Sequence, residues 1–565
     1  MQKQKNNRFA LAILIIVMLA LSTCTPQATQ PPPSLEETGS QGETLIIGLS
    51  SAIMTLDPAD HSDRATETVL RNMFDGLVTR TPQGEVVLEL AESFQQIDDT
   101  TWEFVLKQGV TFHNGEALTT EDVQFTFDRI MAENGIEFGI SNPEPHTSPR
   151  QTFVGPMESI EVIDDYTIHF HFSEPWPVGM QMLVHTQIIP KDYYQEVGAA
   201  GFLEFPVGCG PFRFVEGSLN DQVVMERFDA YYGGANELPP VGPALLARLI
   251  FCVMPDAQAR VVALQAGEVH IIQDVPPELV PTLLSTPYVQ ISSGPSTRPL
   301  WMEMNVNRPP FDDLRVRQAM NYAVDTSRIV EETLNGLGIS LAGPLSPFNE
   351  FAAPNLSPSD SQLPPYSYDP EQALRLLADA GWIDSNGDGY LDQDGERLAF
   401  TIDVRSREES VAEAVAAQLR AIGINVQVEV VADYSLLQEQ LFNGERDAFV
   451  NGWGDSAFDP VGHFEAKWHS RVAGTAYGRG NYSGYANRHV DQLIESGESE
   501  MDQSNRHVIY DQAQQMVYDD VPAVFLVLPY VVEASTIHVH NWKVSSDGRL
   551  NMHDVWLSPL TRENQ

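Results

Sequence analysis

The chain has 565 residues, which is more than one hydrophobic core supports, so two or more lobes are expected. Its composition, 42% hydrophobic and 20% charged, is that of a folded globular protein. The chain has 33 basic and 78 acidic residues, and the resulting net charge of −45 repels nucleic acid and anionic membrane surfaces. This charge balance argues against both as direct partners.

The first residues predict an export signal over 1–23. Three basic residues, Lys3, Lys5 and Arg8, precede an apolar run over 9–21. At about 13 residues, the run is too short for a membrane-spanning helix, which needs roughly 20. The run ends in Leu21-Ser22-Thr23-Cys24, which resembles the lipobox of bacterial lipoproteins and implies lipidation of Cys24. An ordinary secretory signal with an incidental cysteine is the alternative.

Residues 24–43 are predicted to form a flexible tether behind the lipid anchor. They contain Pro31-Pro32-Pro33 with Gln, Thr and Ser, and they lack an apolar pattern. Such a segment cannot bury enough apolar surface to fold. We therefore expect an exported protein that is held at the outer face of the cell membrane or in the periplasm.

The rest of the chain alternates β-rich runs with amphipathic helical segments, which indicates the α/β class. In the first half, strands are predicted at 44–49, 102–106, in two parts of 158–172, within 208–228 and at 248–253. Helices are predicted at 67–75, 119–131 and 257–266, the last ending at Gly267 as a C-cap.

After Pro295 the pattern begins again. A strand over 301–306 precedes helices over 314–324 and 326–334 and a Pro-rich loop over 344–370. The next unit consists of helices at 370–380, 408–422 and 434–443, and strands at 398–404, 425–431 and 447–453. This β-α-β-α-β order predicts a mainly parallel sheet.

Several motifs, in order along the chain, resemble the family 5 extracellular solute-binding proteins, the dipeptide, oligopeptide and nickel receptors of ABC importers. They are Leu56-Asp57-Pro58 with Met73-Phe-Asp-Gly-Leu77, Leu106 to Gly115 with Thr120-Glu-Asp-Val123, Gly208-Cys-Gly-Pro-Phe212, Pro310 to Arg317 with Tyr322-Ala-Val-Asp325, and Gly452-Trp453 through Asp459-Pro460. Cys209 stands where the family has threonine.

The resemblance implies a two-lobed, periplasmic-binding-protein-like fold of type II with an extra N-terminal subdomain, mixed and parallel sheets, and a hinge of two crossing strands. Lobe I would comprise 44–80, 206–297 and 526–565, with 81–205 as its subdomain, and lobe II would comprise 298–525. The family implies a non-enzymatic, monomeric receptor that encloses a small solute, a short peptide, and delivers it to an ABC permease. A separate ATPase would power import, because the chain has no phosphate-binding loop.

Four residues of the Gly-Trp segment are candidate ligand contacts. Peptide-binding relatives hold the ligand's amine with an aspartate three residues after the tryptophan. Here Ser456 occupies that position and Asp455 precedes it. Asp455 is therefore predicted to supply the carboxylate, unless the ligand lacks a free amine. Trp453 would stack on ligand side chains or belong to the core, and Asp459 would contact ligand or form a turn before Pro460.

Two arginines are candidates for the other end of a peptide. Arg405 follows the predicted strand 398–404 at the place where dipeptide-binding relatives capture the C-terminal carboxylate, and Arg407 lies two residues on. A guanidinium suits this task because it pairs with a carboxylate through two hydrogen bonds. Solvent-facing arginines in a loop are the alternative.

An Asp-rich loop suggests a structural calcium ion, although the predicted function requires no cofactor. Asp384, Asn386, Asp388 and Asp392 occupy positions 1, 3, 5 and 9 of an EF-hand-like loop, but position 12 is Gly395 where a glutamate is needed. A hydrogen-bonded turn without a metal is the alternative.

Other hypotheses assign the protein a different ligand or a different functional class. The same fold could bind a nickel chelate, an oligosaccharide or an opine. A surface-anchored hydrolase would need a nucleophile and a base, and the sequence contains no recognisable set of this kind. Cys209 and Cys252 could form one bridge outside the cell or remain two separate thiols.

Overall fold

The computed structural model describes residues 44–359, 364–455, 457–546 and 551–559. The predicted export signal, Cys24 and tether lie outside these residues, as does Ser456. Within the described part of the chain, no helix combines the length and apolar character needed to cross a membrane.

A mixed sheet of twelve strands connects the two halves of the chain. Its path runs β18-β17-β19-β13-β20-β11-β1-β10-β9-β8, with β12 and β14 also paired to β20. The strands from the first half are β1 (Thr44–Leu49), β8 (Phe212–Gly217), β9 (Gln222–Arg227), β10 (Arg248–Val253), β11 (Ile271–Ile272) and β12 (Val289–Pro295). The predicted strands over 44–49 and 248–253 are confirmed, and they pair with each other in parallel.

The strands from the second half are β13 (Leu300–Met304), β14 (Gly338–Ser340), β17 (Ala399–Val404), β18 (Asn425–Val430) and β19 (Ala448–Gly452). β17 is parallel to both β18 and β19, as the β-α-β-α-β order predicts. β13 is antiparallel to β19 and β20, so this half of the sheet is mixed.

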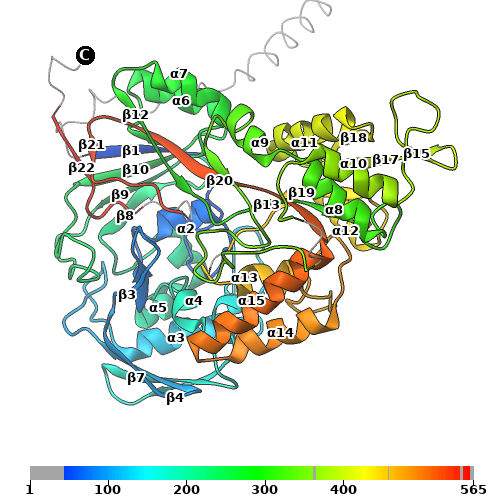
Figure 1. Cartoon of the computed structure of the whole chain (residues 1–565). Helices are drawn as coiled ribbons and strands as arrows, with labels where there is room; N and C mark the ends of the chain where they lie inside the picture. The colour runs from blue at the N-terminus through cyan, green and yellow to red at the C-terminus, as the bar shows by residue number, and fades with distance from the viewer. Residues whose placement is uncertain (1–43, 360–363, 456, 547–550, 560–565) are drawn as a thin grey trace, which may run out of the picture. The chain divides into compact units, whose positions relative to one another are not determined.

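One long strand, β20 (Ala523–Thr536), belongs to both halves of the sheet (Figure 1). Its residues up to Pro529 pair with β13 and β14, and those from Tyr530 onward pair with β12 and β11. β12 itself leads directly into β13. Two antiparallel strands therefore pass side by side from one half to the other, which is the arrangement expected of a two-strand hinge.

A separate antiparallel sheet covers the predicted subdomain, in the order β4-β5-β7-β6. Its strands are β4 (Ala91–Asp98), β5 (Thr101–Leu106), β6 (Met157–Val162) and β7 (Thr167–Phe172), and β4 and β7 are labelled in Figure 1. Alternate residues of β5 and β7, among them Trp102, Phe104 and Phe170, are buried. The opposite face carries polar side chains, so the sheet has one core face and one outer face.

Most predicted helices are confirmed to within two residues at each end. The helices are α2 (Arg64–Leu70), α3 (Thr120–Met131), α4 (Gly179–Leu183), α5 (Lys191–Glu204), α6 (Ala257–Ala266), α7 (Val280–Leu284), α8 (Leu314–Ala323), α9 (Thr326–Glu332), α10 (Pro370–Asp379), α11 (Glu409–Ala421), α12 (Tyr434–Phe442), α13 (Val461–His463), α14 (Arg488–Ser499) and α15 (Gln503–Asp520). Local sequence explains two ends: a capping box joins Thr119 to Asp122 before α3, and left-handed Gly267 ends α6.

The predicted helix over 67–75 is misplaced. α2 begins at Arg64 because the side chain of Asp63 caps it, accepting a hydrogen bond from the Thr66 amide. It ends at Leu70, and the chain then turns through Met73 to meet the Gly208–Phe212 turn. Leu70, Met73 and Phe74 have helical spacing, so the sequence predicts a further helical turn where the structure has this bend.

The remaining elements are short. Three two-stranded pairings join β2 (Val78–Arg80) to β3 (Val86–Leu88), β15 (Asp392–Gln393) to β16 (Glu396–Arg397), and β21 (Val539–His540) to β22 (Trp556–Leu557). Cys209 and Cys252 are both buried free thiols, so the bridge that the sequence allowed is absent.

The turn at Gly208–Phe212 requires its glycines because backbone packs directly on backbone. The Gly210 amide donates to the Met73 carbonyl at 2.9 Å. A Cβ at Gly210 would lie 2.6 Å from the carbonyl carbon of Met73, closer than non-bonded atoms approach. This contact fixes the end of α2 against the start of β8.

We predict that Gly210→Ala lowers the free energy of unfolding by about 1–3 kcal/mol, because neither backbone can move away without cost. Gly294→Ala is the matched control, since its Cβ would meet the nearest atom, on Val544, at an ordinary 3.4 Å. Urea denaturation of the two variants measures the difference. Equal midpoints for both would contradict the close-approach explanation.

Candidate ligand-binding site

The sheet brings the two sets of predicted ligand residues to one edge. Arg405 directly follows β17, and Trp453 directly follows β19. Because β17 and β19 are parallel neighbours, their carboxyl ends meet at the same edge, where α/β sheets commonly bind ligands. β13 is antiparallel to β19, so the hinge residues before Leu300 arrive there too.

Three guanidinium groups surround one buried carboxylate at this edge. The Glu408 side chain is only 3% exposed, and its oxygens lie 2.5 Å from Arg407 Nε, 2.9 Å from Arg298 Nη2 and 3.7 Å from Arg405 Nε. Arg405 also donates to Asn451 Oδ1 at 3.2 Å and lies 4.6 Å above the Tyr434 ring. We call Arg298, Arg405 and Arg407 the arginine cluster.

The arginine cluster carries more positive charge than its own carboxylate balances. Burial lowers the pKa of Arg298 to about 10, and repulsion from Arg407 and Arg405 contributes, with Glu408 opposing the shift. Three cations against one anion leave an excess of two charges, and such an excess favours an anionic partner. The sequence singled out Arg405 and Arg407 but missed Arg298, which belongs to no recognised motif.

The segment after Trp453 contacts the first half of the chain. The Asp455 amide donates to the Thr297 carbonyl at 3.0 Å, and the Thr297 hydroxyl accepts from Arg64 Nη2 of α2 at 3.0 Å. Farther on, the Arg80 guanidinium lies 4.2 Å from the centre of the Phe458 ring. Ala457 and Val461 pack into the subdomain core beside residues such as Trp176.

Asp455 is buried in this segment. Its Oδ1 accepts hydrogen bonds from the amides of Ala457 and Phe458 at 2.9 and 3.0 Å. Burial raises the pKa of Asp455 to about 7, and the charge of Asp459 raises it further, whereas Arg80 opposes the shift. Asp455 is therefore a carboxyl that gains its charge near neutral pH. Ser456, its neighbour, lies outside the described residues.

Asp459 has a structural partner. Both of its oxygens meet the Arg506 guanidinium, at 2.5 and 2.6 Å, and Oδ1 also accepts from the Val461 amide. Both side chains are about 5% exposed. This two-pronged ion pair ties the segment to α15, so the turn alternative accounts for Asp459 within the described contacts.

Trp453 lies between the site edge and the core. Its ring packs against the cluster that includes Trp301 and Trp468, and its carbonyl is 3.0 Å from His463 Nε2. Lys467 and Arg479 lie 5.7 and 5.6 Å from its ring. The indole therefore has cations near it, which adds to the positive character of this edge.

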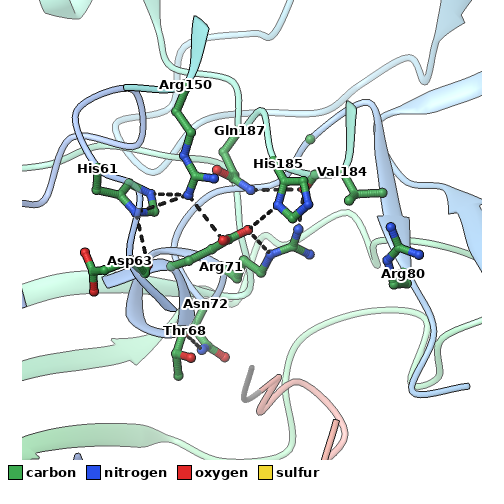
Figure 2. Close-up of polar contacts among 12 residues, drawn as sticks. His61, Asp63, Thr68, Arg71, Asn72, Arg80, Arg150, Val184, His185 and Gln187 are labelled. Carbon is green, nitrogen blue, oxygen red and sulfur yellow. Dashed lines mark hydrogen bonds and ion pairs between the residues drawn. The ribbon is translucent and has the colours of Figure 1, made fainter. Parts of the chain in front are cut away.

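A buried polar network supports α2 next to the Arg64 contact (Figure 2). Glu67 accepts from Arg71 Nε at 3.1 Å and meets Arg150 Nη2 at 3.2 Å and His185 Nδ1 at 3.0 Å. Arg150 also lies 2.7 Å from His61 Nε2. The sequence offered no signal for this network, because its members are far apart along the chain and belong to no motif.

The structure satisfies the Asp-rich loop with its own hydrogen bonds. Asp384 accepts from the amides of Gly387, Asp388 and Gly389. Asp392 is buried and accepts from Ser385, Asn386 accepts from the Asp388 amide, and Asp388 pairs with Arg397 at 2.9 Å. These hydrogen bonds are those expected of a turn, and the structural calcium ion stays a prediction.

A cavity of about 140 Å³ lies elsewhere, lined by residues of the first half such as Arg71, Asp75, Arg80 and Tyr231 and by C-terminal residues such as His553. Tyr231 and Tyr232 donate to Asp75 at 2.9 and 2.8 Å, and burial raises the pKa of Asp75 to about 7. None of the predicted ligand residues that the structure describes lines this cavity. It is therefore distinct from the site at the sheet edge.

Comparison with known proteins identifies the family. Residues 85–475 match the bacterial extracellular solute-binding proteins, family 5 Middle. The chain belongs to this family. The family and the fold both agree with the sequence resemblance.

Relatives cover nearly the whole chain. The oligopeptide-binding protein AppA of Bacillus subtilis is 29% identical over 99% of this chain and 100% of its own length. The glutathione-binding protein GsiB of Pectobacterium atrosepticum is 26% identical over 91% of this chain and 94% of its own. The solved structure of Bacillus subtilis AppA with a nonapeptide superposes with a TM-score of 0.70 at 27% identity, covering 92% of this chain and 99% of that one.

We predict that Asp459→Asn lowers the free energy of unfolding by about 3–5 kcal/mol, because it leaves the buried Arg506 charge unpaired. Glu332→Gln is the control, since Glu332 and its partner Arg328 are both more than half exposed and such pairs contribute about 0–1 kcal/mol. Urea denaturation compares them. An Asp459→Asn variant as stable as the control would return Asp459 to the ligand candidates.

Proposed function

We propose that this protein captures a short peptide, or a peptide-like solute with a free carboxylate, and delivers it to an ABC importer. The observation that carries the proposal is the under-compensated arginine cluster at the edge of a hinged sheet. The names of the relatives AppA and GsiB, an oligopeptide-binding and a glutathione-binding protein, support the same ligand class.

The ligand's carboxylate would meet Arg405, with Arg407 and Arg298 adding charge. Arg405 is held by Asn451 and by the Tyr434 ring, so its guanidinium loses little further freedom when a ligand arrives. The whole chain is strongly acidic, at −45, yet this edge is locally basic. The local charge therefore indicates an anionic group on the ligand, which the net charge of the whole chain does not indicate.

The ligand's amine would meet Asp455, and Trp453 would pack against the ligand between the two ends. An ionised Asp455 at a buried position needs a cation, and a peptide ammonium supplies one. Ser456 and Asp459 are the weaker candidates, Asp459 because Arg506 already holds its carboxylate. Binding would favour closure of the two halves about the crossing strands β12 and β20, and the closed form would engage the permease.

Export and anchoring belong to the same proposal. The basic start, the apolar run over 9–21 and Cys24 support processing by a lipoprotein route, and the Pro-rich stretch supports a tether between lipid and receptor. The protein would act as a monomer at the outer face of the cell membrane or in the periplasm. An ATPase on another chain would supply the energy.

Arg405→Ala should weaken a short peptide with a free C-terminus by at least about tenfold, because the charged hydrogen bond is worth roughly 1.5–3 kcal/mol. The C-terminal amide of the same peptide should bind the parent protein equally weakly. Arg397→Ala, an exposed arginine outside the site, is the control. Isothermal titration measures all three.

The outcomes separate the parts of the proposal. Unchanged affinity in Arg405→Ala would remove this arginine from the site while leaving peptide capture intact. If a thermal-shift screen finds stabilisation by oligosaccharides, opines or nickel chelates and by no peptide, the ligand class is wrong and the family fold remains.

Affinity for a free-amine peptide should rise by about tenfold between pH 5.5 and 7.5. The Asp455 pKa of about 7 lies above its ordinary value of 3.8, so this carboxyl is protonated at pH 5.5 and gains charge as the pH rises, while a peptide ammonium, with a pKa of about 7.7–8.0, stays mostly protonated. Asp455→Asn and an N-acetylated peptide should each abolish the rise. A pH dependence that persists in Asp455→Asn would assign it to another group.

A further inference from the structure

We propose a binding site for a divalent transition metal, with zinc as the representative ion, on the outer face of the subdomain sheet. Its ligands are Glu161, His169 and His171. One ligand atom from each of these side chains lies within 4.8 Å of the others. The site is separate from the arginine cluster, and the inference does not rest on the proposed function.

The strand register creates the cluster. His169 and His171 are two residues apart on β7, so both point to the same face of the sheet. Glu161 of β6 and Glu103 of β5 lie directly opposite His169 on either side. Ile168, Phe170 and Phe172 of β7 point into the core, which fixes the histidines on the outer face.

The side chains are already turned toward one another. His171 Nε2 is 3.4 Å from Glu161 Oε2, and His169 Nε2 is 2.9 Å from Glu103 Oε2. The two imidazole centres are 6.3 Å apart. Glu103 is a positioning residue in this arrangement, because a carboxylate bonded to a ring nitrogen fixes the orientation of a metal-binding histidine.

The separations suit a small ion after slight movement. Zinc takes imidazole nitrogen and carboxylate oxygen at about 2.0–2.2 Å, so atoms bound to one tetrahedral zinc lie about 3.3–3.5 Å apart. The ligand atoms of the three side chains lie within 4.8 Å of one another, so zinc binding needs an inward shift of these atoms on the order of 1 Å. The side chains are partly exposed, and solvent-facing torsions make that shift at little cost.

Donor chemistry selects the metal class. Two imidazoles and one carboxylate suit zinc, nickel or copper better than calcium or magnesium, which prefer oxygen ligands alone. Three protein ligands leave a fourth position for water or a ligand from another molecule. A bound ion would link β6 to β7 and, through Glu103, would restrain β5.

Titration of the metal-stripped full chain with zinc chloride tests the site. We expect one zinc per chain at this position, and the His171→Ala and His169→Ala variants should each bind at least tenfold more weakly. Glu158→Gln removes a charge from β6, the strand of Glu161, outside the cluster. It is the control and should bind zinc as tightly as the parent does. Cobalt absorption should report the same loss of a tetrahedral site in the histidine variants.

The proposal would be overturned if the parent binds no zinc, or if both histidine variants still bind it as the parent does. Circular dichroism should show that the variants are folded, because their side chains lie on the outer face of the sheet. Peptide affinity should be unchanged in all of these variants. The zinc experiment therefore tests the metal site even if the protein binds no peptide, and a failure to bind zinc leaves the proposed peptide site untouched.

Discussion

The arrangement of the molecule depends on β20, a single strand of 14 residues that hydrogen-bonds into both halves of one sheet. Its ends are buried, whereas Pro529, Tyr530 and Val531 between them are only half-buried. Sliding one half past the other would break a ladder of hydrogen bonds on either side, so the permitted motion is bending where β20 and the β12–β13 connection cross. The strand thus determines which residues can approach each other when the halves move.

The candidate site lies beside this crossing for a topological reason. The carboxyl ends of β17 and β19 and the beginning of β13 meet at one edge. This places Arg298, Arg405 and Trp453 together, although about 150 residues separate Arg298 from Trp453 along the chain. Glu408 keeps the three guanidinium groups close by neutralising one charge. The remaining charge makes the edge basic within an acidic protein, and an electrostatic contrast of this kind attracts and orients an anionic ligand.

Local signals predicted much of the fold. The helix over 119–131, the C-cap at Gly267 and the strand over 102–106 depend on neighbours in sequence, and the structure confirms all three. The predicted end of α2 is wrong because contacts with Gly208 and Gly210, far away in sequence, determine the turn after Leu70. The helical spacing of nearby residues carries no information about these contacts. Tertiary contact overrode a local pattern there.

The site was predictable only in part, for the same reason. Arg405 and Asp455 were found through family motifs, but Arg298 comes to the edge through the antiparallel pairing of β13, and no local pattern encodes that pairing. The Arg506 partner of Asp459 lies 47 residues away, so sequence could not distinguish a ligand contact from a structural ion pair. The Glu67 network and the His169–His171 cluster likewise depend on neighbours assembled by the fold.

A crystal structure of the protein with a short acidic peptide bound would test the central claim most directly. We expect the ligand's carboxylate to lie within hydrogen-bonding distance of Arg405 or Arg298, at the carboxyl ends of β17 and β19. A carboxylate held elsewhere, with the arginine cluster still closed on Glu408 alone, would contradict it.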